Sequence, residues 1–315
     1  MLKYLCKRLL RAVLTLTIII VIVFILLRQM PIEGYFDNID KLTEAQIDAR
    51  LEALGLSKPL HEQVFMFMKN LILKGDLGTS WKYQVNVSVT DILKPRIPVS
   101  LKLGSASLIF SLIFGIPLGI LMAKSKGKFF DKLGTAFIVF IQAVPAAVYY
   151  LFIQKYGTQW GNVSMIYNEN NPWWWWLFPV FSMSLGNIAY YGMWLRRYMV
   201  DESNKDYVKL ARAKGASESR IMFRHIFRNA FVPMAQYLPT SFLNTVIGSI
   251  YVESLYGING MGGLLVKAIK VTDNTLVQAI VLLYASVGII GLILGDLLMV
   301  ILDPRISFGK KAGAR

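Results

Sequence analysis

Residues 196–233 read RRYMVDESNKDYVKLARAKGASESRIMFRHIFRNAFVP, the one long polar interval in the apolar second half of the chain. The helical period over about 204–214 places basic side chains on one face and apolar side chains on the other. These faces hold Lys205, Lys209 and Arg212 against Tyr207, Leu210 and Ala211. Gly215 is expected to end this helix, because the residue that follows a helix often adopts a left-handed conformation.

A second helix is expected to follow, with Ser217 as its N-cap. Arg220, Arg224 and Arg228 recur in it at every fourth residue. The interval is therefore predicted to be a helix–glycine–helix hairpin, called here the basic hairpin (residues 196–233). It could lie on the cytoplasmic membrane surface, attracted by anionic lipid. It could instead dock through its small residues into a groove of a partner protein, and periodicity alone favours neither interpretation.

The composition indicates a polytopic membrane protein. Of the 315 residues, 55% are hydrophobic and 13% are aromatic. Six apolar segments are each long enough to cross a bilayer core of roughly 30 Å. They cover about residues 9–27, 101–122, 133–153, 173–195, 237–256 and 276–302. The first segment has no small-x-small cleavage site before Pro31, so we interpret it as a retained span.

The charge distribution predicts the topology. The net charge is +15, and under the six-span arrangement 21 of the 34 Lys and Arg residues fall on one side. These 21 lie in the N-terminus, the 123–132 loop, the 196–236 loop and the C-terminus. By the positive-inside rule that side is the cytoplasm, so both termini are predicted to be cytoplasmic. The basic charge is thus explained by topology, and no nucleic-acid partner is expected.

Residues 29–100 form a polar segment that this topology places outside the cell membrane. Thr43 and Glu44 are expected to open a helix that closes at Gly55, and Pro59 to start another helix that runs to Gly75. The second helix carries apolar residues at helical spacing, namely Leu60, Val64, Phe67, Met68 and Leu71. The two helices are predicted to form a small external cap packed on the ends of the spans.

Other residues of the spans have structural interpretations. Pro117 and Pro145 are expected to kink their helices. Residues 173–176, four consecutive tryptophans, are interpreted as an aromatic belt at the outer membrane surface, with a platform for substrate as the alternative. Asp296 is expected to reach the interface or a neighbouring helix near the inner end of the last span.

No sequence pattern of a catalytic or metal site is present. Neither Gly-Lys pair, at 127–128 and at 309–310, has the spacing of a phosphate-binding loop. The spans lack the paired acids and bases expected of an ion-coupled carrier. Cys6 is the single cysteine, so neither a disulfide nor a cysteine metal site can form. We therefore expect a chain that is not an enzyme, and any ATP-derived energy must come from a separate subunit.

Several motifs carry a resemblance to a known family. The string ARAKG at 211–215, followed by Arg224-His225, Arg228-Asn229-Ala230 and Pro233, resembles the EAA loop of ABC-transporter permeases. The external string GDLG at 75–78 and the ending Asp303-Pro304-Arg305 are similar to the peptide-transport branch of that family. The stretch 253–263 is similar to the family's acidic, aromatic and glycine-rich turn, although Asn259 stands where a proline is frequent.

This resemblance implies a fold. The expected fold is an all-α polytopic membrane protein with six transmembrane helices, the type I ABC importer permease fold, and a small external helical segment after the first span. The implied regions are 1–28 (cytoplasmic start and first transmembrane helix), 29–100 (external helical segment), 101–306 (permease core of five transmembrane helices with the coupling hairpin) and 307–315 (cytoplasmic tail). The implied location is the bacterial inner membrane.

The resemblance also implies a function and partners. The chain would be the permease subunit of an ATP-driven importer that translocates oligopeptides or dipeptides, delivered by an extracellular or periplasmic substrate-binding protein. It would pair with a second homologous permease and with two cytoplasmic ABC ATPases. ATP and Mg would be used by those ATPases, with no cofactor bound by this chain. Some relatives in this branch carry nickel chelates, glutathione or sugars, so these substrates remain open.

The implied site residues fall into three groups. The first helix of the hairpin would be the coupling helix that seats in the ATPase, through Tyr207, Leu210, Ala211, Arg212, Ala213, Lys214 and Gly215, and Arg212 and Lys214 would pair with acids on that subunit. The polar residues Asn244, Thr245 and Ser249 are candidates for the translocation path. An external gate or turn is expected at Glu253, Gly260 and Gly262. The alternative function is a stand-alone secondary carrier or channel with a lipid-binding basic hairpin.

Overall fold

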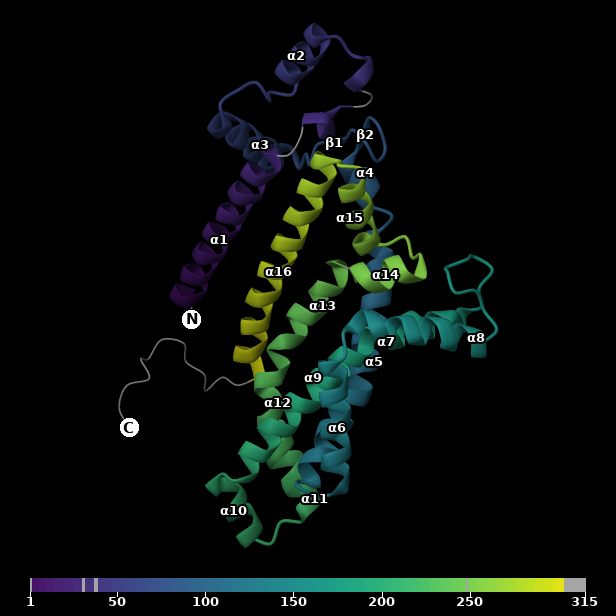
Figure 1. The fold of residues 1–315 in the computed structure, drawn as a ribbon. Helices are drawn as coiled ribbons and strands as arrows, with labels where there is room; N and C mark the ends of the chain where they lie inside the picture. The colour runs from purple at the N-terminus through teal and green to yellow at the C-terminus, as the bar shows by residue number, and fades with distance from the viewer. Residues whose placement is uncertain (1, 30–31, 37–38, 248, 303–315) are drawn as a thin grey trace.

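The computed structural model of the chain describes residues 2–29, 32–36, 39–247 and 249–302 (Figure 1). Apart from turns and loops, such as that at 161–172, these residues are helical. The exception is one antiparallel strand pair outside the spans, β1 (Thr79–Ser80) with β2 (Val87–Ser88), which qualifies the expectation of an all-α protein. The basic hairpin and the external helices lie at opposite ends of an elongated molecule (Figure 1).

Segment 29–100, predicted to lie outside the membrane and called here the external segment, contains the two helices that the sequence predicts. It consists of η1 (Ile32–Tyr35), η2 (Ile39–Lys41), α2 (Glu44–Ala53), α3 (Leu60–Lys74), the strand pair and α4 (Val89–Leu93). Thr43 and Gln46 form a reciprocal capping box at the start of α2. Gly55 and Gly75 both have positive φ, so both helices end where the sequence indicated.

A buried carboxylate fastens this segment to the last helix of the chain. Asp273 precedes α16 (Asn274–Leu302), and its Oδ1 accepts the backbone N–H of Leu276 at 3.0 Å. Its Oδ2 accepts hydrogen bonds of 2.5–3.1 Å from the Ser80 hydroxyl and from three successive backbone N–H groups, those of residues 81–83. Because these partners lie some 190 residues away in sequence, this link was not predicted.

Four long helices form the body of the protein. They are α1 (Leu2–Arg28), α5 (Ile97–Lys124), α9 (Leu177–Ser203) and α16. Helix α1 runs beside α16, while α5 packs closely along α9 (Figure 1). Pro117 lies inside α5, which continues through it as one helix. A bidentate ion pair of 2.5 and 2.7 Å joins Arg196 of α9 to Asp131, near the start of α6 (Phe129–Ala143).

Among the described residues, three helical segments are long and apolar enough to cross a membrane. They are Leu9–Arg28, Val89–Lys124 and Asn274–Leu298. There is a fourth candidate if the two helices Phe129–Ala143 and Ala146–Trp160 count as one span, although the chain bends by 103° between them. The predicted fourth segment corresponds to α9, which is interspersed with polar residues. The predicted fifth is divided between α13 (Tyr237–Ile247) and α14 (Ile250–Tyr256). Six spans therefore remain a prediction.

The sharp bend in the third predicted span occurs at Pro145. Val144 is extended there, as expected for a residue before proline, and this ends α6. The chain then continues at a steep angle as α7 (Ala146–Phe152), the π-helix η3 (Ile153–Gly157) and α8 (Thr158–Trp160), which project sideways in Figure 1. The kink predicted at Pro145 is confirmed, and it is far larger than a kink within a continuous helix.

The four tryptophans form a short 3₁₀ helix, η4 (Trp173–Trp176), that leads into α9. Trp173 is largely exposed, but Trp175 is completely buried and its indole N–H donates to the carbonyl of Ser164 at 2.7 Å. Trp175 also packs edge-on against Tyr256 of α14. The predicted belt is therefore wrong for Trp175, which belongs to the core between α9 and α14, and remains a prediction for the other three tryptophans.

Candidate functional site: the basic hairpin and the outer turn

The basic hairpin has the predicted helix–glycine–helix form. Its first helix is α10 (Asp206–Ala213), slightly shorter than the expected 204–214. Gly215 has φ +76°, a left-handed conformation in which a side chain would be strained. Ser217 then accepts a hydrogen bond from the backbone N–H of Arg220 at 3.4 Å and caps α11 (Glu218–Arg220). Local capping signals therefore fix this turn.

The apolar side chains of α10 do not share one buried face, contrary to the sequence prediction. Val208 is only 1% exposed and anchors the helix against Ile221 and the C-terminal part of α9, whereas Leu210 is 56% exposed. Tyr207 is partly exposed, and Ala211 is half-buried beside Val208. Sequence reasoning missed Val208, although its spacing of three from Ala211 marks the inward face. Leu210 is thus an apolar side chain that the hairpin itself leaves uncovered.

The basic side chains of α10 are paired within the hairpin. Lys209 contacts Asp206 at 2.9 Å, and Arg212 binds Glu218 through two hydrogen bonds of 2.7 and 3.1 Å. These bonds from Arg212 lower the pKa of the Glu218 carboxyl. Sequence reasoning assigned Arg212 to acids of another subunit. In this structure it bridges the turn instead, while Lys214 is exposed at the tip.

The second arm of the hairpin is not the regular α-helix that the arginine spacing suggested. After α11 it continues as a π-helix, η5 (Ile221–Phe227), and then as α12 (Arg228–Ala235). In a π-helix the hydrogen bonds join residues five apart, and Ile221 and Ile226 are accordingly both buried. Arg220, Arg224 and Arg228 are all exposed along this arm, so the arm is basic on its exposed side although it is not a regular α-helix.

One hydroxyl group connects the three segments of the hairpin. Tyr207 of α10 donates to Glu202, at the end of α9, and accepts from the Asn229 side-chain amide of α12 at 2.9 Å. The same hydroxyl lies 3.3 Å from the His225 carbonyl of η5, and Asn229 donates to that carbonyl at 3.0 Å. Partial burial and the neighbouring Glu202 raise the pKa of Tyr207 to about 12. Asn229 and Glu202 were not among the predicted site residues.

At the other side of the spans, Glu253 organises the predicted outer turn. Its side chain is fully buried, and one carboxylate oxygen accepts the Ser100 hydroxyl of α5 at 2.6 Å. The other oxygen accepts the backbone N–H groups of Gly262 and Gly263, at 2.8 and 3.4 Å, at the start of α15 (Met261–Lys270). A carboxylate at this position stabilises the unpaired N–H groups of a helix N-terminus. Glu253 therefore joins α5, α14 and α15.

The glycines of this turn let its backbone come close to the Glu253 carboxylate and to the start of α14. A side chain at Gly260 would collide with the Glu253 carboxylate, and a Cβ at Gly262 would lie 2.7 Å from the Ile250 nitrogen and the Ser249 carbonyl carbon. The structure thus brings together the predicted residues Glu253, Gly260 and Gly262. Ser100 was missed because it is 153 residues away in sequence.

Of the three predicted path residues, only Ser249 has a side chain within the described part of the chain. Ser249 caps α14, where its hydroxyl accepts the backbone N–H of Val252 at 3.1 Å. The side chains of Asn244 and Thr245 lie outside the described part of the chain. Asp296 accepts a hydrogen bond of 2.9 Å from Gln236, the residue that follows α12, so its predicted reach to a neighbouring helix is confirmed.

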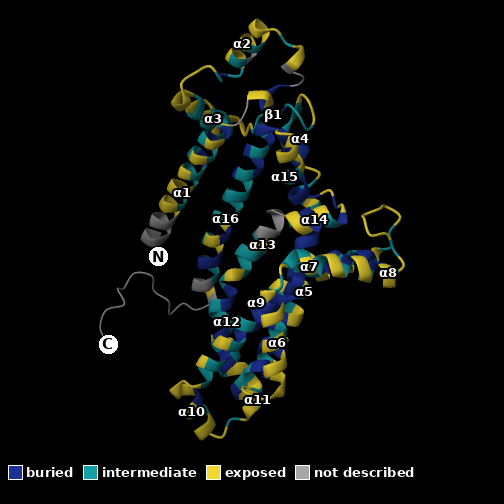
Figure 2. Ribbon diagram, viewed as in Figure 1, coloured by how far each residue is buried: buried dark blue, intermediate teal, exposed yellow. Residues whose placement is uncertain are grey.

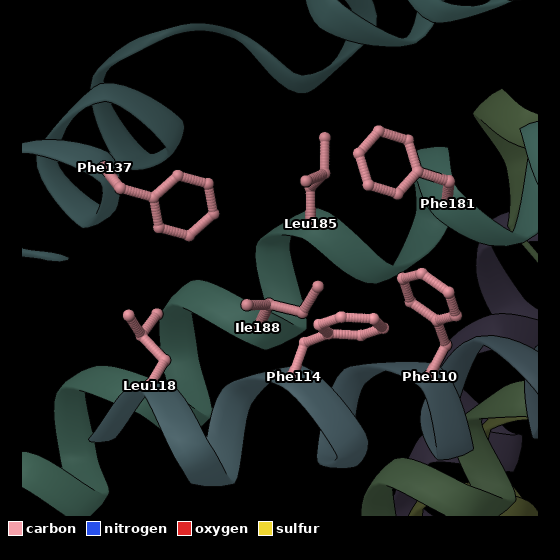
Figure 3. Close-up of a pocket in the computed structure, with 7 residues that line it drawn as sticks. All are labelled: Phe110, Phe114, Leu118, Phe137, Phe181, Leu185 and Ile188. Carbon is pink, nitrogen blue, oxygen red and sulfur yellow. The ribbon is translucent and has the colours of Figure 1, made fainter. Parts of the chain in front are cut away.

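A groove of about 380 Å³ opens between α5, α6 and α9 (Figure 3). It is lined entirely by apolar side chains: Phe110, Phe114, Leu118, Phe137, Phe181, Leu185 and Ile188. Figure 3 shows these side chains converging from the three helices. Since the lining offers no hydrogen-bond donor or acceptor, the groove suits an apolar occupant and not a peptide backbone.

Two family profiles and several known proteins match nearly the whole chain. The family profile described as "Binding-protein-dependent transport system inner membrane component" matches residues 115–308, and the profile described as "Binding-prot-dependent transport system membrane comp, N-term" matches residues 1–104. Similar proteins include the oligopeptide transport system permease protein OppB of Haemophilus influenzae, 31% identical over 98% of this chain and all of that protein. The dipeptide transport system permease protein DppB of Lactococcus lactis is 30% identical over 97% of this chain and 99% of its own.

A solved structure supports the fold. The crystal structure of an amino acid ABC transporter with histidines contains a chain that superposes with a TM-score of 0.51. The similarity covers 69% of this chain and 95% of that chain, at 19% sequence identity. At this level of identity the match supports a common arrangement of the helices and says nothing about the substrate.

Proposed function

The chain belongs to the binding-protein-dependent transport system inner membrane components, and we propose that it is the first of the two permeases of an ATP-driven peptide importer. It is a non-catalytic membrane component, and a transporter of this class implies an ATPase and a binding protein as partners. This membership favours the importer over a stand-alone carrier or channel. Support for a peptide substrate comes from relatives named as oligopeptide and dipeptide permeases, which align over nearly the full chain.

In this proposal the assembly contains a second homologous permease and two cytoplasmic ATPases, which use ATP and Mg. A substrate-binding protein delivers the peptide from outside. The chain crosses the inner membrane six times with both termini in the cytoplasm, in the type I importer arrangement. Helix α9 is the fourth crossing, and α13 with α14 is the fifth. Residues 29–100 form the external region, 101–306 the permease core and 307–315 the cytoplasmic tail.

Helix α10 is the element we assign to the ATPase contact. The observation that supports this assignment is the exposed Leu210 at the tip of an otherwise well-anchored hairpin. A short helix that is rigidly fixed on one face and apolar on the opposite face can seat in a cleft of a second protein. Leu210 would enter that cleft, and the small Ala213 and Gly215 would allow close approach, with Lys214 exposed beside them.

Coupling then follows from how α10 is anchored. When the ATPase pair closes on ATP, it displaces α10 as a rigid body. Val208 transmits the displacement through packing, and Tyr207 transmits it through its hydrogen bonds to α9 and α12. At the outer side, Glu253 holds α14, α15 and α5 as one unit, so that this unit moves as a gate when the spans rotate.

Reconstitution tests the function. The purified assembly in proteoliposomes should take up peptide only when the binding protein is outside and ATP inside. Uptake of peptide without ATP or without the binding protein would contradict the proposal. A set of alternative ligands (a nickel chelate, glutathione and an oligosaccharide), each with the same binding protein, decides whether peptide is the substrate.

A further inference from the structure

Helix α3 of the external segment has apolar residues on two faces. One face packs on the protein through Val64, Phe67 and Leu71, which are half-buried. The other face exposes Phe65, Ile72 and Leu73 by 69%, 71% and 71%. The same side also carries the exposed charges Glu62 and Lys69, so it combines large apolar side chains with charged ones. Three large apolar side chains on one exposed face therefore require an apolar environment.

The neighbouring helix α2 does not share this property. Its exposed positions are charged residues such as Asp48 and Glu52, one glutamine and small alanines, and its large apolar residues Ile47 and Leu51 are half-buried. The two helices belong to the same small segment and differ in what they expose. Figure 2 shows both with exposed residues, but only α3 exposes large apolar ones. The apolar surface is thus local to α3 and is not a general property of the segment.

The position of α3 places this surface at the edge of the membrane. Its Phe67 ring lies 5.5 Å from the ring of Phe24 in α1. Phe24 is one helical turn before Arg28, where the candidate span Leu9–Arg28 ends. Helix α3 therefore contacts α1 where hydrocarbon gives way to headgroups, and Figure 1 shows it lying across that end of α1.

The exposed apolar surface of α1 reaches the same depth in the membrane as α3. Exposed apolar side chains follow this helix towards its outer end at Ile18, Ile22 and Leu26. The exposed side of α3 continues this lipid-facing surface and includes the exposed Lys69, and Lys74 is exposed in the last turn of the helix. Apolar residues with lysines beside them are typical of helices that lie in the interface, because lysine can extend its amine to lipid phosphates.

We propose that α3 is an interfacial helix that binds phospholipid of the outer leaflet. Phe65, Ile72 and Leu73 insert below the headgroups, and Lys69 and Lys74 lie at the level of the phosphates. The partner is the membrane lipid and not the substrate-binding protein. In this arrangement α3 sets the height of the external segment over the bilayer, independently of how the basic hairpin contacts its ATPase.

Nitroxide labels measure this directly, because the chain has a single native cysteine, Cys6. In a Cys6→Ser background, Phe65→Cys, Ile72→Cys and Leu73→Cys are labelled one at a time. The protein is assembled with its partner subunits in nanodiscs of phosphatidylcholine and phosphatidylglycerol. Collision rates with oxygen, which partitions into the bilayer, are compared with those of a water-soluble nickel chelate. Asp48→Cys on α2 is the matched control in the same segment.

The proposal predicts that oxygen collisions exceed nickel collisions at all three α3 positions, with the reverse at Asp48→Cys. Nickel accessibility at Phe65→Cys equal to that at Asp48→Cys would overturn it. The proposal is also overturned if the α3 labels are water-exposed at first and become shielded only when the binding protein is added, because the occupant is then that protein. Neither result bears on ATPase coupling, which is measured separately.

Discussion

The hydroxyl of Tyr207 lies 2.9 Å from the side-chain nitrogen of Asn229, so that α10 is tied to the first turn of α12. The same hydroxyl donates to Glu202 of α9. Tyr207→Phe keeps the ring and removes these bonds, at a cost of about 1 kcal/mol in folding stability. We expect the variant to retain its ATPase subunits and to transport less peptide per ATP hydrolysed. The measurement is the ratio of uptake to hydrolysis in proteoliposomes.

The control for this experiment is Phe223→Tyr on η5, an exposed ring outside the hydrogen-bond network, which should keep the wild-type ratio. If Tyr207 and Asn229 act through one bond, then Tyr207→Phe and Asn229→Ala together should cost little more than either alone. Additive losses, or a wild-type ratio in Tyr207→Phe, would contradict a coupling role for this hydroxyl.

Adding a methyl group in the outer turn should lower the folding stability at Gly262 but not at the neighbouring Gly263. In Gly262→Ala the new Cβ lies 2.7 Å from backbone atoms of residues 249 and 250, and we expect a loss of about 1–3 kcal/mol. In Gly263→Ala the nearest atom is 3.5 Å away, an ordinary contact. Thermal unfolding of the two variants in the same detergent should separate them, and equal midpoints would show that the turn is looser than described.

The buried carboxylate of Glu253 should be required for its charge as well as its shape. Glu253→Gln keeps the volume but replaces one acceptor oxygen with a donor, which then faces either the Ser100 hydroxyl or the N–H of Gly262. We expect a destabilisation of about 1–3 kcal/mol in thermal unfolding. Glu169→Gln, at an exposed acid in an outer loop, is the control. If Glu253→Gln were as stable as this control, the negative charge of Glu253 would not be needed to stabilise the outer turn.

Asp273 should hold the external loop against α16. Asp273→Asn weakens the set of bonds that its Oδ2 accepts from residues 80–83. Freed from α16, this loop is expected to be cleaved faster by trypsin at Lys82 in membrane vesicles with the outer face accessible. Asp91→Asn, at an exposed acid of α4, controls for loss of charge. Unchanged cleavage in Asp273→Asn would show that other contacts hold the loop.

The features that sequence predicted well depend on local chemistry. Gly215 and Ser217 mark the turn of the hairpin, and Gly55 and Gly75 mark the ends of α2 and α3, because capping and left-handed turns are decided within a few residues. The bend at Pro145 belongs to the same class. Its size was not predicted, since a proline fixes where a helix breaks but not the direction in which the chain continues.

The features that were missed depend on contacts across the fold. Ser100 and Asp273 act on partners more than 150 residues away, and nothing in their neighbouring sequence indicates this. The π-helix at 221–227 was also not predicted, because the arginine spacing suits an α-helix and a π-helix equally well. Val208 was left out of the apolar face of α10, although its spacing from Ala211 marks it, and Leu210 was assigned to that face although tertiary packing leaves it exposed.

The central claim is that α10 carries the ATPase contact, and the most direct measurement is affinity purification from the native membrane with ATPase activity assayed on the eluate. Leu210→Glu places a charge on the exposed apolar side chain without touching Val208 or Tyr207. Val85→Glu makes the same kind of change at an exposed apolar residue of the external segment. The account predicts that a homologous permease elutes with all three proteins, and that the ATPase is lost from Leu210→Glu alone. Elution of the wild-type chain without an ATPase, or equal ATPase activity with Leu210→Glu, would contradict it.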